Sequence, residues 1–88
     1  MIEGITSTGF AFAVEEKRLD NMELVDAIAK VDKDPTAVSR VLDLMLGEEQ
    51  KHCLYDHLRT EDGRVPIGAM TDALTEIFAA GGKQAKNS

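Results

Sequence analysis

The sequence predicts a mainly α-helical fold, a compact bundle of about four short helices preceded by a short N-terminal β-strand or hairpin. Three observations support this prediction. Apolar residues recur at the helical period in successive segments, each bounded by residues that begin or end helices. One stretch near the N-terminus alternates large and small apolar residues instead, which is typical of a strand. The chain has no Trp, one Tyr and three Phe, so aliphatic residues and Met must form the core, and helices bury these well.

The strand prediction rests on Phe10, Phe12 and Val14, which alternate with two alanines and therefore fall on one side of a strand. A single strand leaves its backbone N–H and C=O groups unpaired, so it needs a neighbour. That neighbour is either residues 2–5, folded back through the polar turn at 6–9, or a strand of another chain. The second arrangement would make the strand an assembly edge and the protein a homo-oligomer.

The four predicted helices cover, in order, residues 21–31, 35–46, 48–59 and 66–80. Asp20 and Asp34 have the side chain and position of N-caps for the first two helices. Gly47 separates the second helix from the third, because glycine is unfavourable inside helices. Pro66 suits the first turn of the last helix, and Gly81-Gly82 is expected to end it.

These elements indicate one domain. We expect residues 1–80 to form a single helical domain with its N-terminal strand, and residues 81–88 to form a flexible polar tail with little to bury. A chain of 88 residues buries only about 60–65% of the surface that its unfolded form exposes, so its stability should be modest. Association with a partner would stabilise it further.

The chain carries a net charge of −6, which disfavours binding to nucleic acid or to an anionic membrane, since both require a positive surface. The longest uninterrupted apolar stretch, residues 10–14, is too short for a membrane span, and the N-terminus lacks the pattern of a signal peptide. The single cysteine, Cys53, has no internal disulfide partner. We therefore expect a protein of the reducing cytoplasm.

Catalytic and metal-binding patterns are weak. Cys53 and His57 are spaced to share one face of a helix, but His52 would point about 140° away from His57, so the three side chains would not converge on a metal ion. No residue pattern supplies a nucleophile with its base and an oxyanion pocket. The sequence therefore predicts a protein that is not an enzyme and that has no catalytic residues, cofactor or metal.

A DNA-binding helix-turn-helix around Gly47 is the next alternative. The segment at 48–59 would then be the recognition helix, yet its first turn carries Glu48 and Glu49, which would repel phosphates. The pattern favours a corner of protein packing instead.

The candidate binding residues combine the apolar side of the strand with acidic side chains that follow it. Acidic residues concentrate near the first predicted helix and are interspersed with basic ones, which is typical of a solvated face but also suits a basic or helical partner. The candidate partner-binding residues are Phe10, Phe12, Val14, Glu15, Glu16, Glu23 and Asp26.

The order of these features resembles the small tail assembly chaperones of phages and prophages that infect Gram-positive bacteria. A short apolar strand ending in acidic residues, at 9–16, leads to a helix that begins Asp20-Asn21-Met22-Glu23-Leu24-Val25. The segments that follow are Leu44-Met45-Leu46-Gly47-Glu48-Glu49-Gln50, Leu58-Arg59, Glu61-Asp62-Gly63-Arg64-Val65-Pro66 and a closing amphipathic helix. The resemblance covers most of the chain.

This resemblance implies a transient, non-enzymatic protein of the host cytoplasm, absent from the mature virion. Its implied partners are the long helical tape-measure protein, which such chaperones coat, and the major tail protein, which they help to recruit during tail assembly. Members of the family often have a longer form made by translational frameshift. The alternative function from the residues alone is a small acidic regulatory or adaptor protein, such as an inhibitor that imitates nucleic acid.

Overall fold

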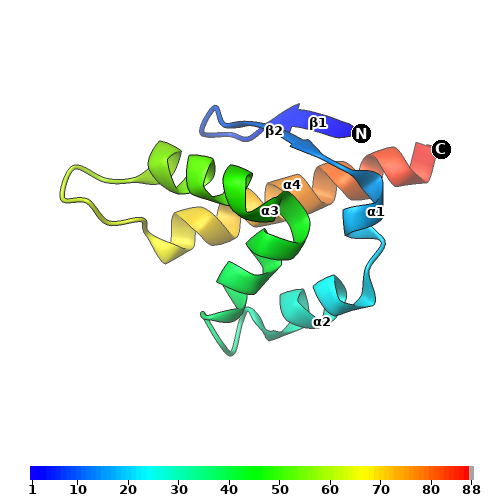
Figure 1. Ribbon diagram of the computed structural model, residues 1–88, viewed down its shortest axis with the longest axis horizontal. Coiled ribbons are helices and arrows are strands. Elements are labelled where there is room, and N and C mark those ends of the chain that lie inside the picture. Colours follow the sequence, from blue (N-terminus) through cyan, green and yellow to red (C-terminus); the bar gives the residue numbers. More distant parts are fainter. Residues whose placement is uncertain (88) are drawn as a thin grey trace.

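The computed structural model describes the backbone of residues 1–87 and the side chains of residues 1–81. The described chain is mainly helical and begins with a β-hairpin (Figure 1). In order, the elements are β1 (Ile2–Ile5), β2 (Ala11–Val14), α1 (Glu16–Leu19), α2 (Met22–Lys30), α3 (Ala37–Leu58) and α4 (Ile67–Asn87). The predicted fold class is therefore confirmed.

The N-terminal strands form an antiparallel hairpin within the chain. β1 pairs with β2 in a register that places Ile2 opposite Val14 and Gly4 opposite Phe12. The turn is closed by the backbone N–H of Thr6, which donates to the carbonyl of Phe10 at 2.9 Å. Of the two arrangements left open by the sequence, residues 2–5 thus supply the neighbouring strand.

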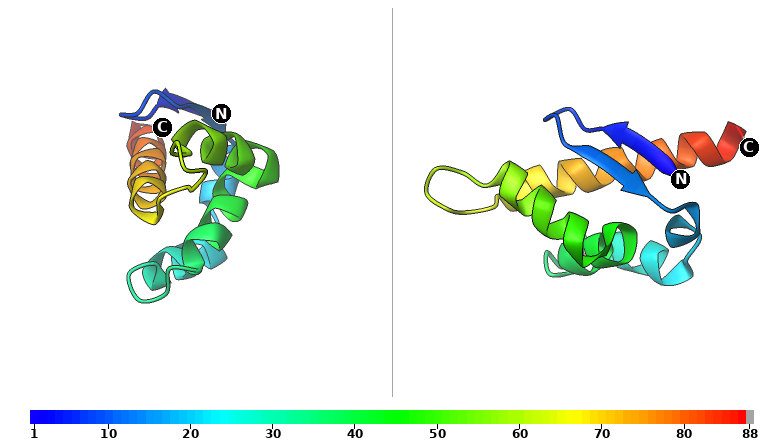
Figure 2. Two further views of the ribbon diagram at one scale, coloured as in Figure 1. Left: turned by 90° about the vertical axis from the view of Figure 1, so that its left-hand side faces the viewer. Right: turned by 45° about the horizontal axis from the view of Figure 1, so that its top comes forward.

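The hairpin lies across α3 and α4, with β1 against α4 and β2 against α3 (Figure 2). Ile2, Phe12 and Val14 are buried against the helices, and a Cβ at Gly4 would lie only 2.8 Å from the Phe12 ring. Glycine at position 4 therefore lets that ring pack beneath the strand.

Two helices also hold the hairpin turn. From α4, the Glu76 carboxylate accepts hydrogen bonds from the Ser7 backbone N–H at 2.8 Å and from its hydroxyl at 3.0 Å. From α3, His57 Nε2 lies 2.9 Å from the carbonyl oxygen of Thr8, while the His57 ring packs beside Phe10. The hairpin is thereby fastened to both helices at its turn as well as through the core.

Helix α3 is bent at Gly47, where φ is +82° and ψ is 162°. This conformation is essentially restricted to glycine, and it separates two straight helical segments. The predicted break at Gly47 is confirmed. The two segments nevertheless follow one another with a single non-helical residue between them, so there is no turn of the length found in a DNA-binding helix-turn-helix.

The start of α2 differs from the prediction. The four-residue α1 was not predicted from the sequence, and Asp20 lies at its C-terminal end. The N-cap of α2 is Asn21, whose backbone is extended and whose Oδ1 accepts from Glu23 N–H at 3.0 Å. The prediction that Asp20 caps this helix is wrong, because the chain is still completing the preceding helical turn there.

The end of α4 also differs. The prediction that Gly81-Gly82 ends this helix is wrong, since α4 continues to Asn87. Gly81 is buried, and a Cβ there would overlap the Leu19 Cδ1. The absence of a side chain thus serves close packing of α4 against α1. Of the predicted tail at 81–88, Ser88 and the side chains of 82–87 lie outside the described residues.

One core joins the hairpin to all the longer helices. Its buried members include residues predicted from helical spacing, such as Leu24, Leu42 and Ile77, together with the inward side of the hairpin. The most completely buried large side chains are Ile2, Val14, Leu24, Val41, Leu42, Met45, Leu54 and Ile77. Among the described helices, none is both long enough and apolar enough to span a membrane.

Candidate protein-docking surfaces

The apolar half of the predicted partner surface lies inside the molecule. Phe10, Phe12 and Val14 are 8%, 5% and 1% exposed, and all three belong to the core. Their placement on one side of a strand was correct, but that side faces α3 and α4. Because the chain's own helices cover these three side chains, a partner could contact them only if the hairpin moved away from α3 and α4.

The acidic pair Glu15 and Glu16 lies at the junction of β2 and α1. Glu15 forms an ion pair with Lys17 at 3.2 Å, and Glu16 lies 3.8 Å from the amino group of Met1. The chain's own positive groups therefore offset part of this negative charge. Both ion pairs are exposed, so they are weak and accessible to a competing partner.

Glu23 and Asp26 lie on α2 and line a groove of about 370 Å³ against the start of α3. Lys30 and Arg40 line the same groove, and an Arg40 Nη2 lies 3.5 Å from the Glu23 carboxylate. The predicted acidic residues are thus brought together, but with cations between them. The groove offers alternating charges and no surface of a single sign.

Asp34 lies at one end of this groove. Its Oδ1 accepts from the Thr36 hydroxyl at 2.6 Å and from the Thr36 N–H at 3.0 Å. These hydrogen bonds, the hydroxyl first, hold the pKa of Asp34 below its ordinary value of 3.8. The helix itself begins at Ala37, two residues later than predicted, so Asp34 shapes the turn before the helix and Thr36 occupies the N-cap position.

A second groove, of about 280 Å³, is more apolar and was not predicted. It lies where α3 meets the start of α4, and its most exposed large side chain is Ile67, at 60%. Its lining comes from the loop before α3, both segments of α3, the loop before α4 and α4 itself: Pro35, Val38, Ser39, Leu42, Tyr55, Val65, Ile67 and Met70. We call this the apolar groove.

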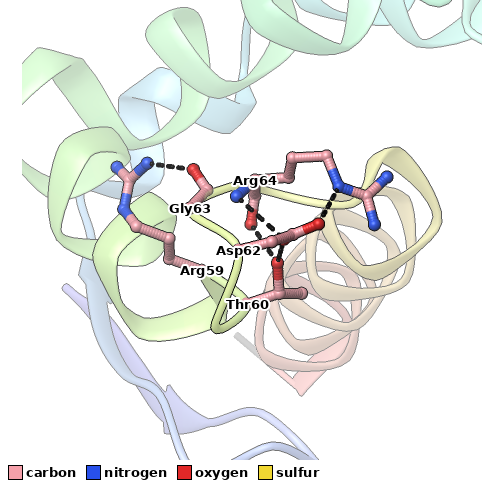
Figure 3. A network of polar contacts seen from close by, with 5 residues as sticks. All are labelled: Arg59, Thr60, Asp62, Gly63 and Arg64. Atoms are coloured by element: carbon pink, nitrogen blue, oxygen red, sulfur yellow. Dashed lines mark hydrogen bonds and ion pairs between the residues drawn. The ribbon is translucent and has the colours of Figure 1, made fainter.

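The loop between α3 and α4 is held by a local polar network (Figure 3). The Thr60 hydroxyl donates to Asp62, and Arg64 Nε donates to the same carboxylate at 2.8 Å. Arg59 donates to the Gly63 carbonyl at 3.0 Å. The contacts of Thr60 and then Arg64 lower the pKa of Asp62 below 3.8.

This network fixes one wall of the apolar groove. Thr60 N–H donates to the Arg64 carbonyl at 2.7 Å, which closes the loop immediately before Val65. The loop turns at Asp62-Gly63, with Gly63 at a φ of +89°. Val65 and Ile67 are therefore presented by an ordered loop and by the first residue of a helix.

The potential metal ligands do not converge in the described part of the chain. His57 contacts the hairpin turn, His52 Nε2 lies 3.9 Å from a Glu48 oxygen, and Cys53 is exposed and free. Within residues 1–81, no three His, Cys, Asp or Glu side chains are grouped to hold a metal ion. His57 therefore serves to hold the hairpin, whereas His52 and Cys53 face solvent.

The features that bear on function are thus the apolar groove, the groove of mixed charge between α2 and α3, and the order of elements along the chain. No protein-family model, no curated protein and no solved structure matches this chain.

Proposed function

We propose that this chain is a non-enzymatic tail assembly chaperone that binds the tape-measure protein and helps to recruit major tail protein during phage tail assembly. The apolar groove carries the proposal, because its lining holds no charged residue and offers a helical partner an apolar surface, whereas each of the other described hollows includes at least one charged side chain. The order of sequence features described above supports the same function.

The groove suits a helix that presents an apolar stripe. Helix-in-groove recognition places side chains at helical spacing into an apolar trough, and the exposed Ile67 and the partly buried Val65 would contact such a stripe. Met70 at the floor has a flexible, polarisable side chain that adapts to differing neighbours. The Tyr55 and Ser39 hydroxyl groups supply polar atoms at the same site.

The net charge of −6 would contribute to the solubility of the complex. A chaperone that covers apolar surface must keep the resulting complex soluble, and a large charge of one sign opposes further association. In this proposal the protein acts in the host cytoplasm and leaves before the virion matures. A frameshifted longer form would add a second binding function to the same N-terminal domain.

The test is co-expression with the neighbouring tape-measure product, followed by pull-down and size-exclusion chromatography. We expect a stable complex with the unchanged chain and a loss of complex with Ile67→Lys, which places a charge in the groove. Met22→Lys is the matched control, since Met22 is 68% exposed on α2, away from the groove. Absence of a complex, or equal effects of the two substitutions, would overturn the proposal.

The alternative is an acidic adaptor that imitates nucleic acid. It predicts that Glu23→Lys or Asp26→Lys would abolish inhibition of a nucleic-acid-binding enzyme while Ile67→Lys would not. The interspersed cations at Lys30 and Arg40 interrupt the acidic surface and favour the chaperone.

A further inference from the structure

The two outer edges of the hairpin differ. At the outer edge of β2, the side-chain amide of Gln50 pairs with the backbone of Ala13: Oε1 accepts from its N–H at 3.0 Å, and Nε2 donates to its carbonyl at 2.7 Å. This side chain occupies the position where a further strand would form its hydrogen bonds. The β2 edge is therefore closed.

The outer edge of β1 is open in the described part of the chain. In an antiparallel pair, residues alternate between those that bond to the neighbouring strand and those that face outward. Since Ala13 faces outward and Thr6 bonds inward to Phe10, the register directs the N–H and C=O groups of Glu3 and Ile5 away from β2. The sheet has two strands, so no third strand takes up these groups.

Apolar surface adjoins this open edge. Ile5 is 71% exposed and Met1 is 70% exposed, and the two flank Glu3 on the outer face of the hairpin. A hollow of about 320 Å³ lies beside the strand, lined by Gly4, Ile5 and Phe12 of the hairpin and by Glu76, Ala79 and Ala80 of α4. A free edge, exposed aliphatic side chains and a hollow with a small-residue wall therefore coincide.

We propose that β1 pairs with β1 of a second copy of this chain, antiparallel, about a twofold axis at Gly4. Glu3 of each copy would then lie opposite Ile5 of the other, and these two residues would exchange backbone hydrogen bonds in both directions. The result is a continuous four-stranded sheet. This interface goes beyond the proposed binding of a tape-measure protein and uses a different surface.

A second copy fits this edge because β1 is self-complementary in that register. Within β1, no like charges lie opposite one another in this register, whereas a shift centred on Glu3 would oppose two carboxylates. Gly4 opposite Gly4 places no side chain at the axis. Beneath the twofold axis, the hollow beside β1 of one copy would face that of the other. The small side chains of Ala79 and Ala80 would allow the two α4 helices to approach closely.

The interface is small, so association should be weak. The full chain should be analysed by light scattering after size exclusion, from about 10 µM to about 1 mM. We expect the mass to rise twofold, to that of two chains. Ala79→Arg fills the shared hollow from an exposed position and should keep the protein monomeric, while Ala29→Arg, exposed on α2, should dimerise as the unchanged chain does.

Hydrogen exchange locates the interface. The amides of Glu3 and Ile5 should exchange more slowly as the concentration rises, while that of Ala11, which faces the opposite edge, should not change. A chain that remains monomeric over the whole range overturns the proposal. A dimer that persists in Ala79→Arg, or that leaves the exchange of Glu3 and Ile5 unchanged, overturns it equally.

Discussion

The side chain of Gln50 satisfies both backbone polar groups of Ala13, with an N–H to Oε1 distance of 3.0 Å and an Nε2 to carbonyl distance of 2.7 Å. Gln50 comes from the second segment of α3, so the two contacts tie the hairpin to the helix that carries most of the core. An amide is the side chain that both donates and accepts in this way.

Gln50→Leu should therefore destabilise the fold by about 1–3 kcal/mol, because it leaves a partly buried donor and acceptor without partners. The measurement is urea denaturation, read as a shift of midpoint with an unchanged slope. Gln50→Glu should also destabilise, since a carboxylate cannot donate to the Ala13 carbonyl. Glu49→Leu, at the exposed neighbouring position, is the control. Equal effects at 49 and 50 would argue against the Ala13 contacts as the cause.

Gly81→Ala should destabilise by about 1–3 kcal/mol, because the added Cβ overlaps Leu19 and the helices must separate to admit it. In an open helical position the same substitution is favourable. Gly68, also in α4, has no heavy atom near its Cβ position, so Gly68→Ala should be neutral or stabilising by up to about 1 kcal/mol.

The Leu19→Ala background separates the contact from a general effect of helix propensity. In that background, the cost of Gly81→Ala should largely disappear, which a double-mutant cycle by thermal unfolding would measure. An undiminished cost there would contradict the close contact between position 81 and Leu19.

The helices were predictable where apolar spacing and a single special residue agreed. Gly47 marked a break between two helical segments, and α3 is bent there. The errors arose where a residue type has more than one use. Gly81 indicated a helix end by composition alone, yet it is a packing position against Leu19, a residue distant in the sequence. Local patterns carry no information on such a contact.

The docking surfaces were less predictable than the fold. Phe10 and Phe12 were recognised as one apolar side, but spacing cannot tell whether the chain's own helices or a partner will cover that side. The apolar groove combines Pro35, Tyr55 and Ile67, which come together only when α3 bends and α4 returns beside it.

Acid should weaken two turns. The pKa values of Asp34 and Asp62 lie below 3.8 in the folded chain, so the unfolded chain binds these protons more readily. Each carboxylate therefore contributes fully to the stability of the folded chain at a pH above 3.8. This stabilisation is lost as the pH falls through the lower pKa of the folded state. An NMR titration of the carboxyl carbons should show both depressed values.

Substitution of each hydroxyl donor tests the cause. Thr36→Val should raise the pKa of Asp34 toward 3.8 and leave that of Asp62 unchanged, because the Thr36 hydroxyl makes the largest contribution to the first shift. Thr60→Val should do the reverse. If either substitution moves both values together, the shifts do not originate in these local hydrogen bonds.

The bend of α3 gives the sharpest test of a backbone requirement. At φ +82° and ψ 162°, Gly47 lies outside the left-handed helical region that Asn tolerates and inside a region that is essentially glycine-only. Gly47→Ala and Gly47→Asn should therefore both destabilise, each by about 1–3 kcal/mol in urea denaturation. If Gly47 lay in the left-handed helical region, Gly47→Asn would instead destabilise the fold less than Gly47→Ala. A stable Gly47→Ala variant with an unbent helix, seen as continuous amide protection through residues 46–49, would contradict the bend.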